Sequence, residues 1–156
     1  MVELEKINFS DVLYVAQNMR ERDREEVNLC RWDDDDFERL AEDCMSNTVF
    51  GWLAKVDGEP VAVLGAVPAR PGVWNAYLFA TDRWSEVSST MSKVARRQFL
   101  PVLRTAGAHR VECHSMEGYD IIHKWIEWCG LRREAEVPGF GKDGRKFIRF
   151  AKVWNS

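Results

Sequence analysis

The chain has 156 residues, of which 46% are hydrophobic and 30% charged, and its formal net charge is -3. This length and balance are typical of a single globular domain over 1–156 that buries a core without metal or disulfide staples. The negative charge disfavours nucleic acid as a partner, and no apolar run approaches the ~20 residues that cross a bilayer. The N-terminus also lacks the layout of a signal peptide, so we expect a soluble protein of the cytoplasm.

The first third of the chain is predicted to form one strand and two helices. Apolar and charged residues alternate from Val2 to Ile7, as in a half-buried strand. Ser10 or Asp11 is then expected to cap a helix that runs out into the charged stretch 20–26. A second helix is expected after position 36, with apolar residues at helical spacing at Phe37, Leu40, Ala41 and Cys44.

The run Asp33 to Asp36, which precedes that helix, has two interpretations. Carboxylates bind calcium or magnesium, but this run lacks the alternating spacing and the glycine of a calcium loop. Acidic residues at the start of a helix also cap it and complement its dipole. We therefore predict a capped helix and no metal site.

The rest of the chain alternates strand and helix patterns. A hairpin is expected over 48–56 and 60–67 with its turn at Asp57-Gly58. Further strands are expected over 73–80, 109–115, 132–137 and 146–153, and helices over 85–100 and 120–128. Pro101 should kink or end the first of these helices. The strand–helix–strand unit implies one parallel pairing, so the predicted class is α/β (α+β): a mixed, mostly antiparallel sheet with helices on both faces.

The cysteines and tryptophans carry weaker signals. Four cysteines lie far apart without a C-x-x-C pair, which argues against a zinc site and predicts buried apolar thiols. His109 and His123 have no partner at a telling spacing and are predicted to lie on the surface. Seven tryptophans are many for this length, and such residues fill cores or anchor interfaces.

Several segments resemble a known family. The segment 120–131 is a predicted helix ending in Gly130 and an apolar residue, and it resembles the late helix of the GNAT (Gcn5-related N-acetyltransferase) fold. The order of elements resembles this fold along almost the whole chain. Segments 79–84, 93–99 and 143–147 are similar to GNAT-like proteins of short-tailed bacteriophages, which are labelled acetyltransferase or internal virion protein. The resemblance implies a phage or host protein partner and a place in the host cytoplasm or the virion.

The expected cofactor loop departs from the family pattern. In the GNAT fold a loop R/Q-x-x-G-x-G/A presents bare backbone N–H groups to the pyrophosphate of acetyl-CoA. The matching stretch keeps Arg83 but has Glu86 and Ser88 in place of the glycines. A carboxylate about 4 Å from a phosphate charge would repel it by at most about 4 kcal/mol at an effective dielectric of roughly 20. An ordinary helix start capped by Ser85 is the alternative interpretation. The residues that the resemblance would place against acetyl-CoA are Phe79, Thr81, Arg83, Ser85 and Ser88.

The proton-transfer groups of the family are also altered. Many GNAT enzymes place a tyrosine four residues before the glycine of the late helix, where this chain has Ile126. Tyr119 lies at the start of that helix, too far along the chain to be a simple replacement. Glu112 and His114 share one face of their strand and are the candidate acid–base pair. A solvated strand face is the alternative.

The preferred hypothesis is a GNAT-fold bacteriophage protein with a degenerate acetyl-CoA loop, no cofactor, and a non-catalytic binding or virion-assembly role. The alternative is an active acetyl-CoA-dependent N-acetyltransferase that acts on a small amine or a protein amine. Neither hypothesis involves a membrane, a metal or a nucleic acid.

Overall fold

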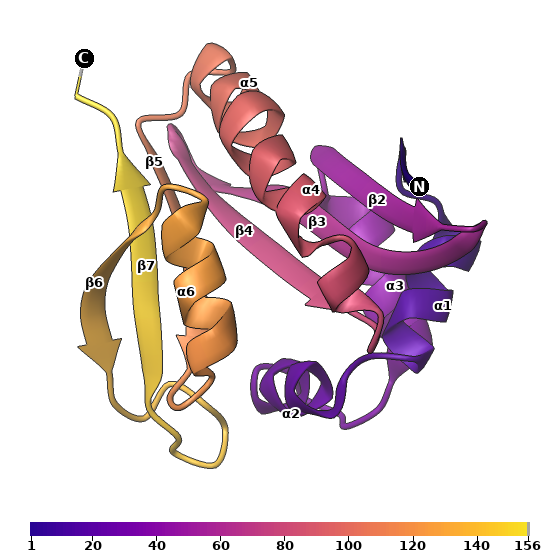
Figure 1. Cartoon of the computed structure of the whole chain (residues 1–156). Coiled ribbons are helices and arrows are strands. Elements are labelled where there is room, and N and C mark those ends of the chain that lie inside the picture. The colour runs from indigo at the N-terminus through magenta and orange to yellow at the C-terminus, as the bar shows by residue number, and fades with distance from the viewer. Residues whose placement is uncertain (156) are drawn as a thin grey trace.

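The computed structural model describes residues 1–155 and is built around one seven-stranded sheet (Figure 1). The strands are β1 (Val2–Glu5), β2 (Phe50–Val56), β3 (Glu59–Arg70), β4 (Val73–Ala80), β5 (Arg110–Met116), β6 (Arg132–Val137) and β7 (Phe147–Val153). Their spatial order is β1-β2-β3-β4-β5-β7-β6, and all neighbours are antiparallel except the pair β4 and β5. The predicted mixed, mostly antiparallel sheet is confirmed.

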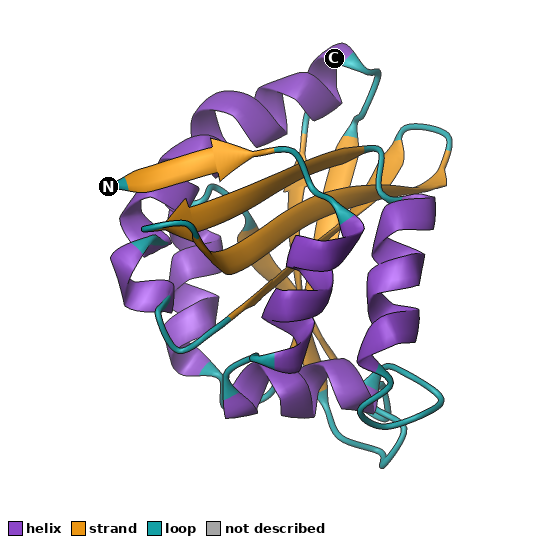
Figure 2. Cartoon of the chain, turned by 90° about the vertical axis from the view of Figure 1, so that its right-hand side faces the viewer, coloured by secondary structure: helices purple, strands orange, loops and turns teal. Residues whose placement is uncertain are grey.

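Helices cover both faces of this sheet (Figure 2). They are α1 (Phe9–Gln17), α2 (Glu21–Leu29), α3 (Phe37–Asn47), α4 (Ser88–Val94), α5 (Leu100–Thr105) and α6 (Asp120–Trp128). α1 and α3 pack against Leu53, Val63 and Phe79 on one face. α4, α5 and α6 pack on the opposite face. Both faces of the sheet carry apolar side chains for these helices, because successive strand residues point to alternate sides. No helix in the described part of the chain is long and apolar enough to cross a membrane.

The parallel pairing of β4 with β5 is short. It joins only the start of each strand, from Val73 with Arg110 to Asn75 with Glu112. Beyond this point the two strands diverge toward their carboxyl ends, as Figure 1 shows. The sheet is therefore split over part of its height, with β1 to β4 on one side of the gap and β5 to β7 on the other.

Two predictions for the N-terminal segment are wrong. The first helix is capped by Asn8, whose side chain accepts a hydrogen bond from the Asp11 N–H at 3.0 Å, and not by Ser10 or Asp11. The charged stretch 20–26, into which this helix was expected to run, belongs instead to a separate helix, α2. Its polar sequence hides it, because the residues that α2 buries are Leu29 and the acidic Asp23. The predicted capping role is confirmed for Asp36, whose carboxylate accepts a hydrogen bond from the Arg39 N–H.

The helix predicted over 85–100 is interrupted in a way that the sequence did not indicate. It begins with a 3-10 turn over Trp84–Glu86, continues as α4, widens into a π turn at Ala95–Phe99 and goes on through α5. Pro101 therefore does not end it. In a π turn each N–H bonds to the carbonyl oxygen five residues earlier instead of four. The helix can therefore continue past Pro101, although proline has no N–H to donate.

The core-filling role predicted for tryptophan is confirmed for three residues, and an interface role stays a prediction. Trp74, Trp84 and Trp125 are buried in the core, whereas Trp32 is 99% exposed and Trp128 is 66% exposed.

Candidate functional site

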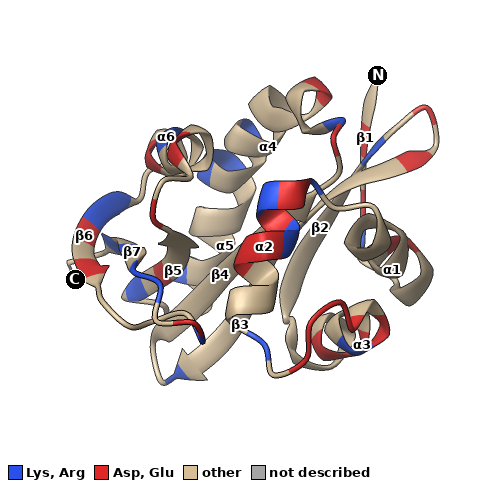
Figure 3. Ribbon diagram, turned by 90° about the horizontal axis from the view of Figure 1, so that it is seen from below, with Lys and Arg blue, Asp and Glu red and all other residues tan. Residues whose placement is uncertain are grey.

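A cavity of about 410 Å³ occupies the gap between the diverging strands. Its walls come from β4 through Tyr77, Leu78 and Phe79 and from β5 through Cys113, His114 and Ser115. α2 and α3 close one side, and α6 with the π turn closes the other. Figure 3 shows α2 between α6 and the pair α1 and α3, at the end of the sheet where the strands part. The split in the sheet thus creates a pocket, which we call the splay pocket.

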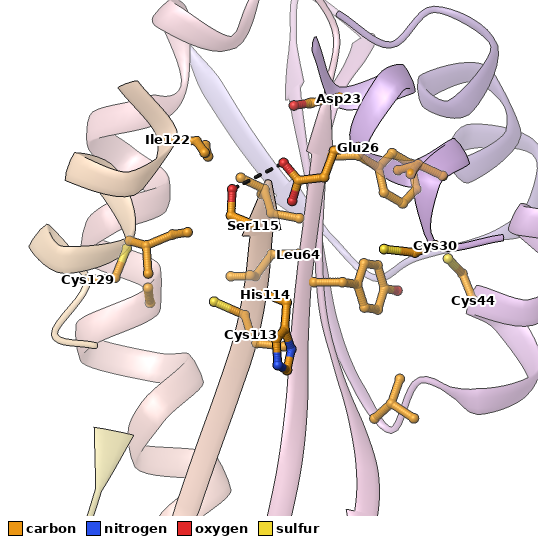
Figure 4. Close-up of a pocket in the computed structure, with 18 of the residues that line it drawn as sticks. Asp23, Glu26, Cys30, Cys44, Leu64, Cys113, His114, Ser115, Ile122 and Cys129 are labelled. Atoms are coloured by element: carbon orange, nitrogen blue, oxygen red, sulfur yellow. Dashed lines mark hydrogen bonds between the residues drawn. The ribbon is translucent and has the colours of Figure 1, made fainter. Parts of the chain in front are cut away.

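The pocket receives a carboxyl group from α2. Glu26 points toward β5, where the Ser115 hydroxyl donates a hydrogen bond to its Oε2 at 3.2 Å (Figure 4). Ser115 Oγ also lies 3.0 Å from His123 Nε2, so three side chains from three elements form a connected chain. Burial, reinforced by the charge of Asp23, raises the pKa of Glu26 to about 8. The carboxyl group is therefore mostly neutral at pH 7 and ionises at about pH 8.

Asp23 lies one helical turn before Glu26 and has a structural role. Its oxygens accept hydrogen bonds from Arg20, from the Ala80 N–H at 2.9 Å and from the Tyr119 hydroxyl at 2.6 Å. These bonds tie α2 to the end of β4 and to the start of α6. Tyr119 is consequently held by Asp23, and burial raises the pKa of its hydroxyl.

The predicted pair Glu112 and His114 is not joined by a hydrogen bond in residues 1–155. Arg110 Nε donates to Glu112 at 2.7 Å, because these residues are neighbours on one face of β5. The His114 ring lines the pocket and stacks on Phe140, with ring centroids 4.4 Å apart. Burial lowers the pKa of His114, so its ring stays neutral near pH 7. A catalytic role for either residue stays a prediction.

The prediction that His123 lies on the surface is wrong. Only 6% of this residue is exposed, and its Nε2 contacts both Ser115 Oγ and the Met116 carbonyl oxygen, at 3.0 and 3.1 Å. The apolar residues of α6 face the sheet, and His123 shares this face because β5 supplies hydrogen-bonding partners there. His109 is exposed, as predicted.

All four cysteines line the splay pocket: Cys30, Cys44, Cys113 and Cys129. The prediction of buried thiols is wrong for Cys30, which is exposed because it ends α2 at the pocket edge, and Cys113 is only partly buried. Burial raises the pKa of Cys30 and Cys44 to about 11, so the thiols are neutral at pH 7. Within the described residues no group of three His, Cys, Asp or Glu side chains is placed to hold a metal ion.

The predicted cofactor loop is folded on itself. The N–H groups of Trp84, Glu86 and Val87 donate to the carbonyl oxygens of Thr81, Arg83 and Trp84 at 2.9 to 3.0 Å. Ser85 makes no capping bond: α4 begins at Ser88 with Val87 at its N-cap position, so the predicted cap is wrong. Thr81 Oγ1 accepts from the Arg83 N–H, and Phe79 is buried in the core.

The Arg83 side chain is fully paired within the protein. Its guanidinium donates to Glu86 at 2.7 and 2.9 Å and also binds Glu59 on β3. The Arg83 charge holds the pKa of Glu86 below its ordinary value. A pyrophosphate at this loop would have to displace two carboxylates and compete with the backbone bonds of the 3-10 turn. The residues present therefore do not fit the phosphate end of acetyl-CoA.

Two tryptophans link the start of α4 to α6. Trp84 and Trp125 pack edge to face with ring centroids 5.0 Å apart, and Arg20 lies over the Trp84 ring. Trp125 Nε1 donates to the Ser88 carbonyl oxygen at 3.0 Å. This contact joins α4 and α6 beside the predicted cofactor loop. The Trp125 side chain, which lines the pocket, therefore bounds it where acetyl-CoA was expected.

No family model matches the chain, and no curated protein sequence matches it. Solved structures do match over nearly its whole length. The GNAT-family acetyltransferase from Bacillus anthracis has a TM-score of 0.71 and 12% identity, covering 97% of this chain and 94% of its own. The ribosomal-protein-alanine N-acetyltransferase from Brucella melitensis has a TM-score of 0.71 and 10% identity, covering 97% and 99%. The Bacillus subtilis acetyltransferase in complex with CoA has a TM-score of 0.68 and 11% identity, covering 99% and 98%.

These likenesses show that the chain has the GNAT acetyltransferase fold. At this level of identity they show the fold alone. The three structures are described as acetyltransferases, and one of them holds CoA. The predicted resemblance in fold is confirmed. The resemblance to phage virion proteins stays a prediction.

The sequence did not point to Glu26 as a pocket residue. It stands in the run Glu25-Glu26-Val27, which looks like part of a solvated helix face. The helical spacing did contain an indication. Asp23 and Glu26 lie on the same helix face as Leu29 and Cys30, and a helix face that ends in apolar residues is typical of the buried side.

Proposed function

We propose that this protein is a GNAT-fold binding protein in which the acetyl-CoA loop has lost its phosphate site, so that it acts without transferring an acetyl group. The observation that carries this proposal is the pairing of Arg83 with Glu86 and Glu59 above a closed 3-10 turn. We also propose a role in particle assembly, with a phage or host protein as partner. This part is supported by the sequence resemblance at 79–84, 93–99 and 143–147.

The first test is isothermal titration of the wild type with acetyl-CoA. We expect no heat at micromolar concentrations. Glu86→Gly combined with Ser88→Gly removes one of the two carboxylates that bind Arg83 and leaves the pair with Glu59, and should raise affinity by at least about tenfold, or about 1.4 kcal/mol. The matched control is Glu42→Gly with Ser46→Gly on the exposed side of α3, which should leave binding unchanged. Micromolar binding by the wild type contradicts the proposal.

The assembly role has a separate test. Tagged protein expressed during infection should be recovered with particles or with a defined assembly partner after density-gradient separation. Recovery only as free protein contradicts this part. Retention on DNA should be absent at low and at high salt alike, since the net charge is -3.

A second candidate is an active acetyl-CoA-dependent N-acetyltransferase that acts on a small amine or a protein amine. Glu26 is the observation in its favour: its carboxyl group lies in the splay pocket, ionises at about pH 8 and can in that form take a proton from a bound amine. Thiol release from acetyl-CoA across a panel of amines and peptides tests it. Turnover that is lost in both Glu26→Gln and Arg83→Ala supports this candidate, and no turnover supports the binding role.

A further inference from the structure

Glu26 differs from the other carboxylates around the splay pocket. Asp23 is paired with Arg20 at 2.8 Å and Asp43 with Arg31 at 2.6 Å. Glu26 has no ion-pair partner in residues 1–155; its polar contacts are neutral donors, the Ser115 hydroxyl at 3.2 Å and the backbone N–H of Met116. A carboxyl group in an apolar cavity is costly to ionise unless an opposite charge accompanies it. The pocket therefore has room for one positive charge that the protein itself does not supply.

Apart from the ion pair of Arg31 with Asp43 and the polar side chains of Asn47 and His114, the remaining wall is apolar and aromatic. Rings come from both sides of the sheet, from Tyr77 and Phe79 on β4, Phe99 in the π turn and Trp125 on α6. The four thiols are neutral, and the Tyr77 hydroxyl is already bonded to Thr48 Oγ1 at 2.7 Å. These surfaces offer dispersion contacts and the negative faces of aromatic rings, which attract cations.

Hydrogen-bond acceptors are scarce beside Glu26. The oxygens of Asp23 are occupied by Arg20, the Ala80 N–H and Tyr119, which leaves the Glu26 carboxylate and the Ser115 hydroxyl. A primary ammonium brings three diverging N–H donors, whereas the free acceptors lie on the Glu26 side alone, so a donor directed at the apolar wall is left without an acceptor and costs about 1–3 kcal/mol. A tertiary ammonium brings one donor and a quaternary ammonium none. The site therefore favours an alkylated nitrogen.

We propose that the splay pocket binds an organic cation with a tertiary or quaternary nitrogen, its charge against Glu26 and its apolar body along the aromatic wall. The volume of about 410 Å³ suits a small molecule of this kind. This inference names the ligand class for the binding role proposed above and rests on that role. The ligand differs from an acetylation substrate, because a quaternary nitrogen has no free electron pair to attack an acyl group and a tertiary nitrogen has no substituent proton to lose in forming an amide.

The test compares four probes that share one alkyl chain and differ in head group: hexyltrimethylammonium, hexylamine, hexanoate and hexanol. Isothermal titration of the wild type should show binding of hexyltrimethylammonium, at least about tenfold weaker binding of hexylamine and hexanol, and none of hexanoate. Glu26→Gln, which keeps the size and the bond to Ser115, should weaken hexyltrimethylammonium binding by at least about tenfold. Glu21→Gln, on the exposed start of the same helix, is the matched control and should change nothing.

Equal binding of hexylamine, hexanol or hexanoate overturns the proposal, as does undetectable binding of hexyltrimethylammonium or unchanged affinity in Glu26→Gln. The head-group series on the wild type decides the question even if that variant does not fold. A parallel titration with acetyl-CoA separates the two proposals: heat there overturns the non-enzymatic role, whereas the head-group series reports on the ligand class alone.

Discussion

Glu26 places an ionisable group where water is scarce, and this has a consequence for stability. Its pKa is about 8 in the folded protein against an ordinary value of 4.5. Between these values the folded state keeps a proton that the unfolded state has released. Stability from this group is therefore complete at low pH and is lost as the pH rises toward about 8.

Glu26→Gln should remove that pH dependence. For the wild type, the contribution of Glu26 to the free energy of unfolding should fall by about 1.4 kcal/mol per pH unit at most between about pH 5 and pH 8. Urea unfolding at several pH values measures it. The difference between wild type and variant isolates Glu26 from His114 and His123, whose lowered pKa values act in the opposite direction. A difference that does not vary with pH contradicts the assigned pKa.

Asp23 should be the more costly residue to remove. Asp23→Ala leaves Arg20 without its partner and the buried Ala80 N–H without an acceptor, so we expect a loss of about 3–5 kcal/mol in the free energy of unfolding. Tyr119→Phe removes one donor and leaves the other bonds in place, and should cost about 1–2 kcal/mol. Chemical denaturation gives both values. Equal losses would contradict the view that Asp23 is the centre of this network.

At the scale of elements, β3 and β4 shape the pocket through a cross-strand pair. Gly65 lies opposite Tyr77, and a Cβ atom at Gly65 would come within 2.4 Å of the tyrosine ring. The missing side chain on β3 thus lets the ring lie flat across the sheet, where it also stacks on Phe79 with centroids 6.0 Å apart.

Gly65→Ala should displace the Tyr77 ring and change the pocket. The overlap should cost about 1–3 kcal/mol of stability and weaken hexyltrimethylammonium binding along with it. Thermal unfolding and the titration described above measure the two effects. Gly51→Ala on β2 is the control, because the neighbours that its Cβ would meet are side-chain atoms of Ile7 at 3.1 Å and of Thr48 at 3.2 Å, neither of which lines the pocket. Full binding by Gly65→Ala would show that Tyr77 does not shape the ligand site.

At the scale of the whole molecule, the split sheet leaves two halves with few strand contacts. The loop 138–146 bridges them from the side of β6 and β7. Lys142 Nζ donates to the Arg31 carbonyl oxygen at 2.8 Å and to Asp34 at 2.6 Å, and Arg145 pairs with Glu25 on α2. These pairs are largely exposed, so each should contribute little to global stability. Their effect should instead be local, on how readily the pocket opens.

Lys142→Ala combined with Arg145→Ala should raise hydrogen exchange in β5 and α6 while changing the unfolding free energy by less than about 1 kcal/mol. Lys146→Ala is the matched control, because Lys146 pairs with Glu117 and Glu136 in the same half of the molecule. Exchange that is unchanged in the double variant, or raised equally in the control, contradicts a bridging role for this loop.

Local patterns accounted for most of the elements. The β2–β3 hairpin, β4 to β7 and the bounds of α6 follow from alternation, turn residues and helix-ending glycines, which act over a few neighbouring residues. The same reasoning missed α2 because its buried positions include a charged side chain. It predicted a kink or an end at Pro101 but not the π turn through which the helix continues, because a π turn is not encoded by one residue.

By itself, the sequence determined the order of the strands and of the helices other than α2, the mixed sheet and the loss of glycines at 86 and 88, since each depends on residues close together in the chain. Only the tertiary structure decided that Arg83 pairs with Glu59 across the chain, that four distant cysteines surround one cavity and that Glu26 faces it. The physical reason is that charge pairing and pKa depend on which groups become neighbours in space and how much water remains between them, and the split between β4 and β5 sets both.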